Sequence, residues 1–248
     1  MQKHDHDATR LAIEAERCRR DAHYFIFEKV ITKDEHDLDN AEKPFPDLLY
    51  LHALLDCLLV SGKLIKPKDA RYALDAGLFP QWLDTIHQSG ILFLEKSRQI
   101  MASWLICAYL LWRARGRKHQ LILAQSKKED DAANLVYNKE PFNARISFME
   151  SKLPRHLRSC VFPTNGSKCH IFFPNGSHIW GIPEGGDIVR SNTASVIFSD
   201  EAAFQPEFGS AYTAALPSVK GGGQMIAVSS AEPGEFCDLV EGLEEVRR

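Results

Sequence analysis

Two adjacent carboxylates follow an apolar segment in the second half of the chain. Residues 195–199 read Ser-Val-Ile-Phe-Ser, and Asp200 and Glu201 come directly after them. Such a run predicts a strand that is buried on both faces, and two acids at its end lose hydration unless a cation compensates them. In a nucleoside-triphosphate hydrolase that cation is Mg²⁺ with its phosphates: the first acid orders the metal and the second polarises the attacking water. The alternative interpretation is a strand that ends in a solvated acidic turn.

A polar loop upstream of these acids carries groups of the kind that bind phosphates. Residues 96–103 read Lys-Ser-Arg-Gln-Ile-Met-Ala-Ser and separate a short apolar run from a long apolar segment. A P-loop needs backbone N–H groups around the phosphates, a lysine, and a hydroxyl for Mg²⁺ at a helix N-terminus. The order of strand, polar loop, hydroxyl and apolar helix is present, but Met101 and Ala102 stand where the motif has its second glycine and its lysine. The alternative is an ordinary loop in which Lys96 and Arg98 are solvated.

The elements that must position these groups are short apolar runs without polar alternation, which are typical of parallel strands covered by helices on both faces. They lie at residues 91–94, 121–124, 196–198 and 225–228. The last run ends in Ser229 and Ser230, whose hydroxyls could sense a γ-phosphate or simply belong to a turn. Because ligands bind at the carboxyl ends of such strands, the loop at Lys96 and the acids are expected to share one site.

Other segments complete a mostly parallel α/β domain. Residues 103–113 and 128–137 have helical patterns. Residues 169–173 and 178–182 flank Pro174-Asn175-Gly176-Ser177, and an Asn-Gly pair between apolar segments predicts an antiparallel hairpin.

The first 48 residues are predicted to be a helical appendage, followed by a second unit over residues 49–248. Apolar residues at helical spacing predict one long helix with a single stripe, formed by Leu11, Ala15, Cys18, Ala22 and Phe25. An acidic loop at residues 33–42 and a Pro-containing helix breaker at 43–46 come next. Further helices are expected over residues 48–60, 69–76 and 81–87.

Composition excludes several classes of protein. The 248 residues are 44% hydrophobic and carry a net charge of −3, which excludes a strongly cationic binder but not a local basic groove. The N-terminus has no signal-like apolar segment, and the longest apolar run, residues 104–112, is too short to span a bilayer. We therefore expect a soluble, cytoplasmic protein without a membrane partner.

Two groups of side chains allow more than one interpretation. The basic clusters are residues 113–119 and the set Lys152, Arg155, His156 and Arg158; each could contact a DNA backbone or close a helix in solvent. Cys160, Cys169 and His170 include types of zinc ligand, but Cys169 and His170 are adjacent and would point to opposite faces of a strand.

Taken in order, these motifs resemble the ATPase domain of the large terminase subunit of tailed bacteriophages, the motor that packages DNA. Residues 96–104 are similar to its deviant Walker A, and residues 197–204 to its Walker B. The strand at 121–126, the hairpin at 173–179 and the coupling motif at 229–231 have counterparts in the same order. The resemblance covers roughly residues 91–233 and implies a P-loop (ASCE/RecA-like) three-layer fold with a mostly parallel sheet.

The resemblance also implies roles for single residues. The phosphate-binding residues would be Lys96, Ser97, Arg98, Gln99, Ile100, Met101, Ala102 and Ser103. Ser103 and Asp200 would hold Mg²⁺, Glu201 would be the catalytic glutamate, and Ser229 and Ser230 would bind nucleotide and couple hydrolysis to movement. The arginine finger would be Arg190, acting on a neighbouring subunit, or Arg98 within its own. Tyr50 and Gln81 are the candidates for adenine recognition.

The activity so implied is ATP hydrolysis that drives double-stranded DNA into a procapsid, with ATP and Mg²⁺ as cofactors. The implied partners are double-stranded DNA, the portal protein, the small terminase subunit and further copies of this chain in a pentameric ring, in the cytoplasm of an infected bacterial host and not in the mature virion. The family's RNase H-like nuclease domain, and with it nuclease activity, is expected to be absent, because little sequence follows Pro233. The alternatives are a helicase-like ATPase, or a nucleotide-binding scaffold without turnover, against which the presence of Glu201 argues.

Overall fold

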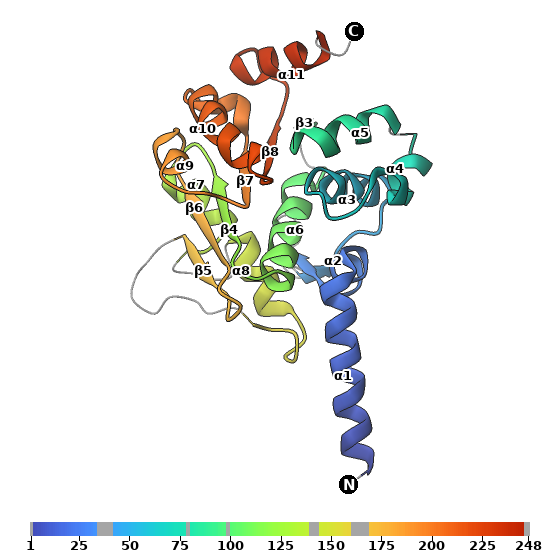
Figure 1. Ribbon diagram of the computed structural model, residues 1–248. Helices are drawn as coiled ribbons and strands as arrows, with labels where there is room; N and C mark the ends of the chain where they lie inside the picture. The colour runs from blue at the N-terminus through green and yellow to red at the C-terminus, as the bar shows by residue number, and fades with distance from the viewer. Residues whose placement is uncertain are drawn as a thin grey trace.

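A six-stranded sheet forms the centre of the molecule (Figure 1). The computed structural model describes residues 2–33, 42–77, 80–97, 100–138, 144–159 and 169–245. The strand order is β3-β8-β7-β4-β6-β5, in which β5 alone is antiparallel to its neighbour. The strands are β3 (Ile91–Glu95), β4 (Leu121–Gln125), β5 (His170–Phe172), β6 (His178–Ile182), β7 (Val196–Asp200) and β8 (Gln224–Ser229). The four predicted parallel strands and the hairpin are therefore confirmed.

The sheet is covered on both faces, which explains why its strands lack polar alternation. Every residue of β7 and β8 is buried. Phe198 and Ile226 belong to the hydrophobic core on one face, while Ile197 and Met225 belong to the core on the other. Successive side chains of a strand point to opposite faces, so the middle of a strand that packs on both sides carries consecutive apolar residues.

Helices form the two outer layers (Figure 1). The first core is shared with α2 (Ala22–Lys29), α3 (Leu49–Ser61), α6 (Ala102–Gly116), α7 (Glu129–Leu135) and α8 (Arg145–Lys152). The second is shared with α9 (Asp187–Arg190), α10 (Phe208–Lys220) and α11 (Glu235–Glu245). This is the predicted three-layer α/β fold. It also places α6, which is buried on almost all sides, directly behind the polar loop that follows β3.

The hairpin between β5 and β6 also closes the end of α6. Gly176 has φ +81°, which a side chain would strain. The side-chain amide of Asn175 donates to the carbonyl oxygens of Ala114 and Arg117, at 2.8 Å each, and so satisfies carbonyls left open at the helix end. The Asn-Gly pair thus serves both the turn and the helix.

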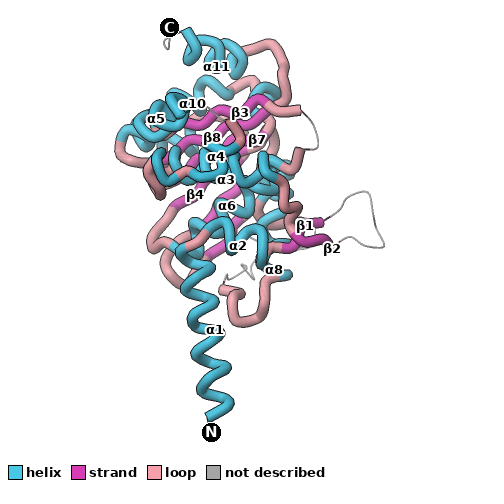
Figure 2. Tube along the Cα trace, turned by 90° about the vertical axis from the view of Figure 1, so that its right-hand side faces the viewer, coloured by secondary structure: helices cyan, strands magenta, loops and turns pink. Residues whose placement is uncertain are grey.

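The N-terminal region consists of two helices rather than the single predicted one. The helix α1 (Gln2–Arg20) ends before Asp21, which has an extended backbone. The Asp21 carboxylate caps α2 by accepting a hydrogen bond from the Tyr24 backbone N–H. Cys18 and Phe25 pack into the same core as α3 and α6, whereas the start of α1 projects away from the sheet (Figures 1 and 2). The boundary at residue 48 stays a prediction.

The remaining elements of this region flank the sheet. The short strands β1 (Ile31–Lys33) and β2 (Glu42–Pro44) pair antiparallel at one side of the molecule (Figure 2). Most of the predicted acidic loop between them lies outside the described residues. The predicted helices are confirmed as α3, the 3-10 turn η1 (Pro67–Asp69) with α4 (Arg71–Asp75), and α5 (Pro80–Ser89).

The basic clusters take part in packing. Arg113 is buried and donates to the side-chain oxygens of Tyr109 (3.0 Å) and Gln224 (2.7 Å), which ties α6 to the start of β8. Arg115 pairs with the buried Glu150 at 2.7 Å. Within the first cluster, the residues exposed to solvent are therefore Arg117, Lys118 and His119.

The second cluster is engaged as well. Lys152 pairs with Glu42, and His156 lies 3.0 Å from Glu14. A DNA contact at either cluster stays a prediction.

Two searches gave negative results within the described ranges. None of the helices there is both long and apolar enough to cross a membrane. No group of three or more His, Cys, Asp or Glu side chains there is arranged to hold a metal ion; Cys160 lies outside these ranges.

Candidate nucleotide-binding site

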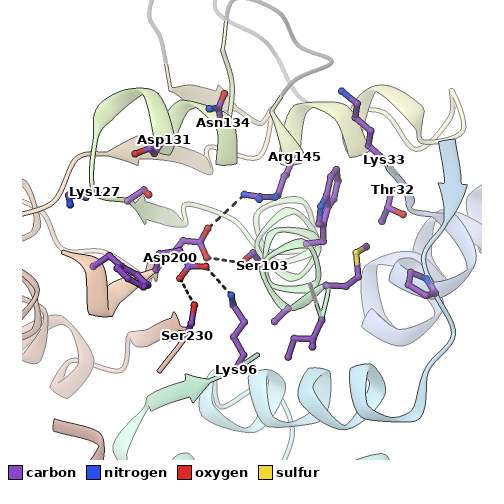
Figure 3. Close-up of a pocket in the computed structure, with 18 of the residues that line it drawn as sticks. Thr32, Lys33, Lys96, Ser103, Lys127, Asp131, Asn134, Arg145, Asp200 and Ser230 are labelled. Carbon is purple, nitrogen blue, oxygen red and sulfur yellow. Dashed lines mark hydrogen bonds and ion pairs between the residues drawn. The ribbon is translucent and has the colours of Figure 1, made fainter. Parts of the chain in front are cut away.

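A cleft of about 980 Å³ opens at the carboxyl edge of the sheet (Figure 3). Its lining includes the loop before α6, the acids after β7, the end of β8 and the β1–β2 pair. Five cationic side chains, Lys33, Lys43, Lys96, Lys127 and Arg145, face three anionic ones, Asp131, Asp200 and Glu201. Among the described lining residues the charge is therefore net positive, which suits a polyanionic ligand.

Lys96 reaches the acid pair from the end of β3. Its backbone N–H donates to the Ser229 carbonyl at 2.9 Å, which continues the β3–β8 pairing by one residue and fixes where the side chain starts. The ammonium lies 3.0 Å from Glu201 Oε1, and the Lys96 side chain is only 7% exposed, against 41% for Glu201. The fold thus brings together two residues that are 105 positions apart in the sequence and that were expected to share one site.

Ser103 and Asp200 form the second pair. The Ser103 hydroxyl, in the first turn of α6, donates to Asp200 Oδ1 at 2.7 Å. Burial raises the pKa of Asp200, and the charge of Arg145 and the bond from Ser103 offset this only in part. A buried carboxylate beside a hydroxyl is a hard-oxygen donor set of the kind that binds Mg²⁺.

Hydrogen bonds hold the turn that carries both acids. The Gln205 amide donates to the Asp200 carbonyl at 2.8 Å, and the Ala203 backbone N–H donates to Ser229 Oγ at 3.1 Å. Ser229 is fully buried and does not line the cleft, so its hydroxyl acts on this turn. Ser230 does line the cleft and donates to Glu201 Oε2 at 3.4 Å.

Two non-glycine residues at the cleft have left-handed backbone conformations. Met101 has φ 58° and ψ 10°, and Glu201 has φ 53° and ψ 47°. Such conformations cost a side-chain-bearing residue on the order of 1 kcal/mol or more and concentrate at functional sites. Met101 occupies the N-cap position of α6 without a capping side chain, so no N-cap side chain occupies the first N–H groups of this helix.

The backbone at Met101 yields a test of this geometry. We expect the free energy of unfolding, measured with urea, to be about 1 kcal/mol higher for Met101→Gly than for Met101→Ala. Both variants lose the same packing, but only alanine retains the strain of the left-handed backbone. In a helix interior the order would be reversed, because alanine is the better helix former there. Equal stability of the two variants, or a more stable alanine variant, would show that Met101 does not adopt this conformation.

Several lining residues were not predicted from the sequence. Ser126 and Lys127 follow β4, and their position after a parallel strand was a usable signal. Asp131 and Asn134 lie on α7. Arg145 begins α8, and its guanidinium lies 3.8 Å from Asp200 Oδ2. No sequence motif marks Arg145, because only the packing of α8 against α6 brings it to the cleft.

Solved structures of other proteins share the fold of this chain. The large terminase of bacteriophage HK97 matches 68% of the chain with a TM-score of 0.50 and 15% sequence identity. The large terminase of a thermophilic bacteriophage matches 79% of it with a TM-score of 0.51 and 14% identity. The fold is that of phage large terminases. The chain spans 37% and 42% of the lengths of these two terminases, no protein-family model matches it, and neither does any curated protein sequence.

Not every residue assigned by the terminase resemblance lies in the cleft. Ile100 to Ser103 line it, but Ser97 is exposed outside it, and Arg98 and Gln99 lie outside the described residues. Arg190 lines a different cavity, on α9, where it pairs with Asp187 at 3.1 Å. An action of Arg190 on the cleft of its own chain is thus not part of this arrangement.

The candidates for adenine recognition are not placed at the cleft either. The Tyr50 hydroxyl donates to the Ile100 carbonyl at 3.2 Å, so it supports the loop without lining the cleft. The side chain of Gln81 is outside the described part of the chain.

Proposed function

We propose that this chain is the ATPase motor domain of a terminase-like large subunit, which hydrolyses ATP to move double-stranded DNA into a procapsid. The observation that carries the proposal is the pair of contacts in one cleft, Lys96 with Glu201 and Ser103 with Asp200, on a terminase fold. A lysine, a hydroxyl and two acids in this arrangement are the minimum set for Mg²⁺-dependent phosphoryl transfer to water.

The side chains fit a magnesium nucleotide. Lys96 and the N–H groups at the start of α6 would hold the phosphates, and Ser103 with Asp200 would hold Mg²⁺. When bound, Mg²⁺-ATP supplies the phosphoanhydride bond and a cation that neutralises charge on the transferred phosphoryl group. Glu201 orients a water and accepts its proton, while Ser230 holds the other carboxylate oxygen.

The Lys96–Glu201 ion pair belongs to the resting site. Glu201 must be free to accept a proton, and Lys96 must face the phosphates. The proposed roles of both residues therefore require this ion pair to open. Because Glu201 is 41% exposed while Lys96 is nearly buried, Glu201 has the greater freedom to move. Binding of the nucleotide would thus open the Lys96–Glu201 ion pair and leave Lys96 facing the phosphates and Glu201 facing water.

The implied partners belong to the same proposal: double-stranded DNA, the portal protein and the small terminase subunit, in the cytoplasm of an infected bacterial host. The position of Arg190 supports action between copies of the chain. Its side chain is 56% exposed and lies away from its own cleft, as an arginine that serves a neighbouring subunit would. Such an arginine can raise the rate by about 10³–10⁵-fold.

The test is the Mg²⁺-dependent release of phosphate from ATP by the wild type and by Lys96→Ala. We expect at least a hundredfold loss in Lys96→Ala, since the charge that meets the phosphates is removed. Lys68→Ala, which removes an exposed lysine that does not line the cleft, serves as the matched control. The rates are measured at rising protein concentration, because an arginine supplied in trans needs a neighbour.

Other outcomes discriminate between the alternatives. Unchanged turnover in Lys96→Ala would refute the assignment of the site. Nucleotide binding without turnover in the wild type would instead support a scaffold module. Turnover that is stimulated by single-stranded nucleic acid but not by duplex DNA would support a helicase-like ATPase.

A further inference from the structure

Arg145 is paired with Asp200, the residue that would hold Mg²⁺ when the site is filled. Its guanidinium lies 3.8 Å from Asp200 Oδ2, on the side of the carboxylate away from the bond to Ser103. Asp200 is buried, so an unbalanced charge there is costly, and Arg145 supplies a compensating charge. A divalent cation at the same carboxylate would repel the guanidinium.

The backbone of Arg145 is fixed, while its charged group is not fully engaged. Arg145 begins α8, which is packed on α6 through the edge contact between Phe148 and Trp104, and its guanidinium lies 5.9 Å from the Trp104 ring. Its Nε is enclosed yet has no hydrogen-bond acceptor among the described residues. A guanidinium with unused donors and a partly exposed end can rotate without moving its helix.

The directions of the two cations define where an anion would lie. Figure 3 shows Lys96 pointing toward the acids from one side of the cleft and Arg145 from the other. Both line the same cleft, and the N-terminus of α6 lies between them. A phosphate held by Lys96 would therefore face a guanidinium that leaves Asp200, and a planar guanidinium could bind two of its oxygens at once.

We propose that Arg145 binds the terminal phosphate of a nucleoside triphosphate. When the site is empty, Arg145 instead pairs with Asp200 and occupies the side of that carboxylate where Mg²⁺ would bind. The inference deepens the proposed function and rests on it. It assigns to Arg145 the discrimination between triphosphate and diphosphate within its own subunit, distinct from the action of Arg190 on a neighbour. With Mg²⁺ and nucleotide bound, Arg145 would leave Asp200 for the phosphate; without the terminal phosphate, Arg145 would pair with Asp200 again.

The test measures binding rather than turnover. A non-hydrolysable ATP analogue and ADP, each with Mg²⁺, are titrated calorimetrically into the wild type, Arg145→Gln, Arg145→Lys and the control Arg71→Gln, which removes an exposed arginine on α4 outside the cleft. We expect Arg145→Gln to weaken binding of the triphosphate by about tenfold and binding of ADP by less than about twofold, as the loss of a charge-assisted hydrogen bond requires. Arg145→Lys should fall between, because a lysine keeps the charge but not the two-pronged geometry.

A second readout follows Asp200 without nucleotide. Mg²⁺ alone should raise the thermal midpoint of Arg145→Gln more than that of the wild type, because the competitor for the carboxylate is gone. Equal losses for triphosphate and ADP, or no loss, would show Arg145 to be a structural partner of Asp200 and overturn the inference. If the wild type binds neither nucleotide, the proposed function fails together with the inference. If the wild type binds both and the Arg145 variants bind them with the same affinities, the inference alone fails. Should Arg145→Gln not fold, Arg145→Lys decides by the same ratio.

Discussion

Glu201→Gln is expected to reduce the Mg²⁺-dependent ATPase rate by about 10²–10⁴-fold. The amide has the shape of the carboxylate and can keep the contact with Ser230, but it cannot accept a proton from water. The exposure of Glu201 and its left-handed backbone set it apart from Asp200, which is buried beside Ser103. The loss should therefore fall on the chemical step.

Binding should change in the opposite direction. Glu201 pairs with Lys96 at 3.0 Å, so removal of its charge frees the ammonium for the phosphates. We expect Glu201→Gln to bind a triphosphate at least as tightly as the wild type, measured by calorimetry beside single-turnover rates. Glu28→Gln, an exposed change on α2, is the control. A variant that loses affinity and rate together would indicate that Glu201 binds ligand rather than acting on water.

Asp200→Asn is expected to abolish Mg²⁺-dependent turnover while making the ligand-free protein more stable. Burial is the largest influence on Asp200 and raises its pKa, which means that the ionised carboxylate is less favourable in the folded than in the unfolded chain. Asparagine can still accept the Ser103 bond through its carbonyl oxygen, and it carries no charge to desolvate. The stabilisation should therefore exceed the loss of the attraction to Arg145.

The pH dependence has a definite sign. Where the folded pKa is above the unfolded value, the folded state binds more protons, so the stability of the wild type falls as the pH rises through the folded pKa of Asp200. Asp200→Asn should lack this component, and its advantage should grow toward neutral pH.

Thermal unfolding at several pH values checks the expectation, since each kcal/mol corresponds to about 2–4 °C for a chain of this size. Asp75→Asn, at an exposed position on α4, is the control. Mg²⁺ should stabilise the wild type but not Asp200→Asn. An Asp200→Asn variant less stable than the wild type at neutral pH would mean that Asp200 is a structural acid.

Local sequence was sufficient to predict the sheet and to expect Lys96, Asp200 and Glu201 in one site. Strands such as Val196–Asp200 have consecutive apolar residues, here Val196 to Phe198, because helices cover both faces, and this pattern is visible without the structure. The groups that follow the strands, Lys96, Glu201 and Ser230, meet because parallel strands end at one edge. Their types and order therefore indicated the chemistry, and the fold brought them within hydrogen-bond distance.

Tertiary structure alone decided the features that depend on distant segments. Ser229 ends β8 and Ser230 follows it, yet the hydroxyl of Ser229 is buried and accepts a hydrogen bond from the Ala203 N–H instead of lining the cleft. Arg113 belongs to a basic run but is enclosed by Tyr109 and Gln224.

Arg145 carries no motif and reaches Asp200 only because α8 packs on α6. Local pattern reports which face of an element is apolar, since that is a property of neighbours in sequence. The partner of a polar side chain is set by which elements pack together, and that is a property of the folded chain as a whole.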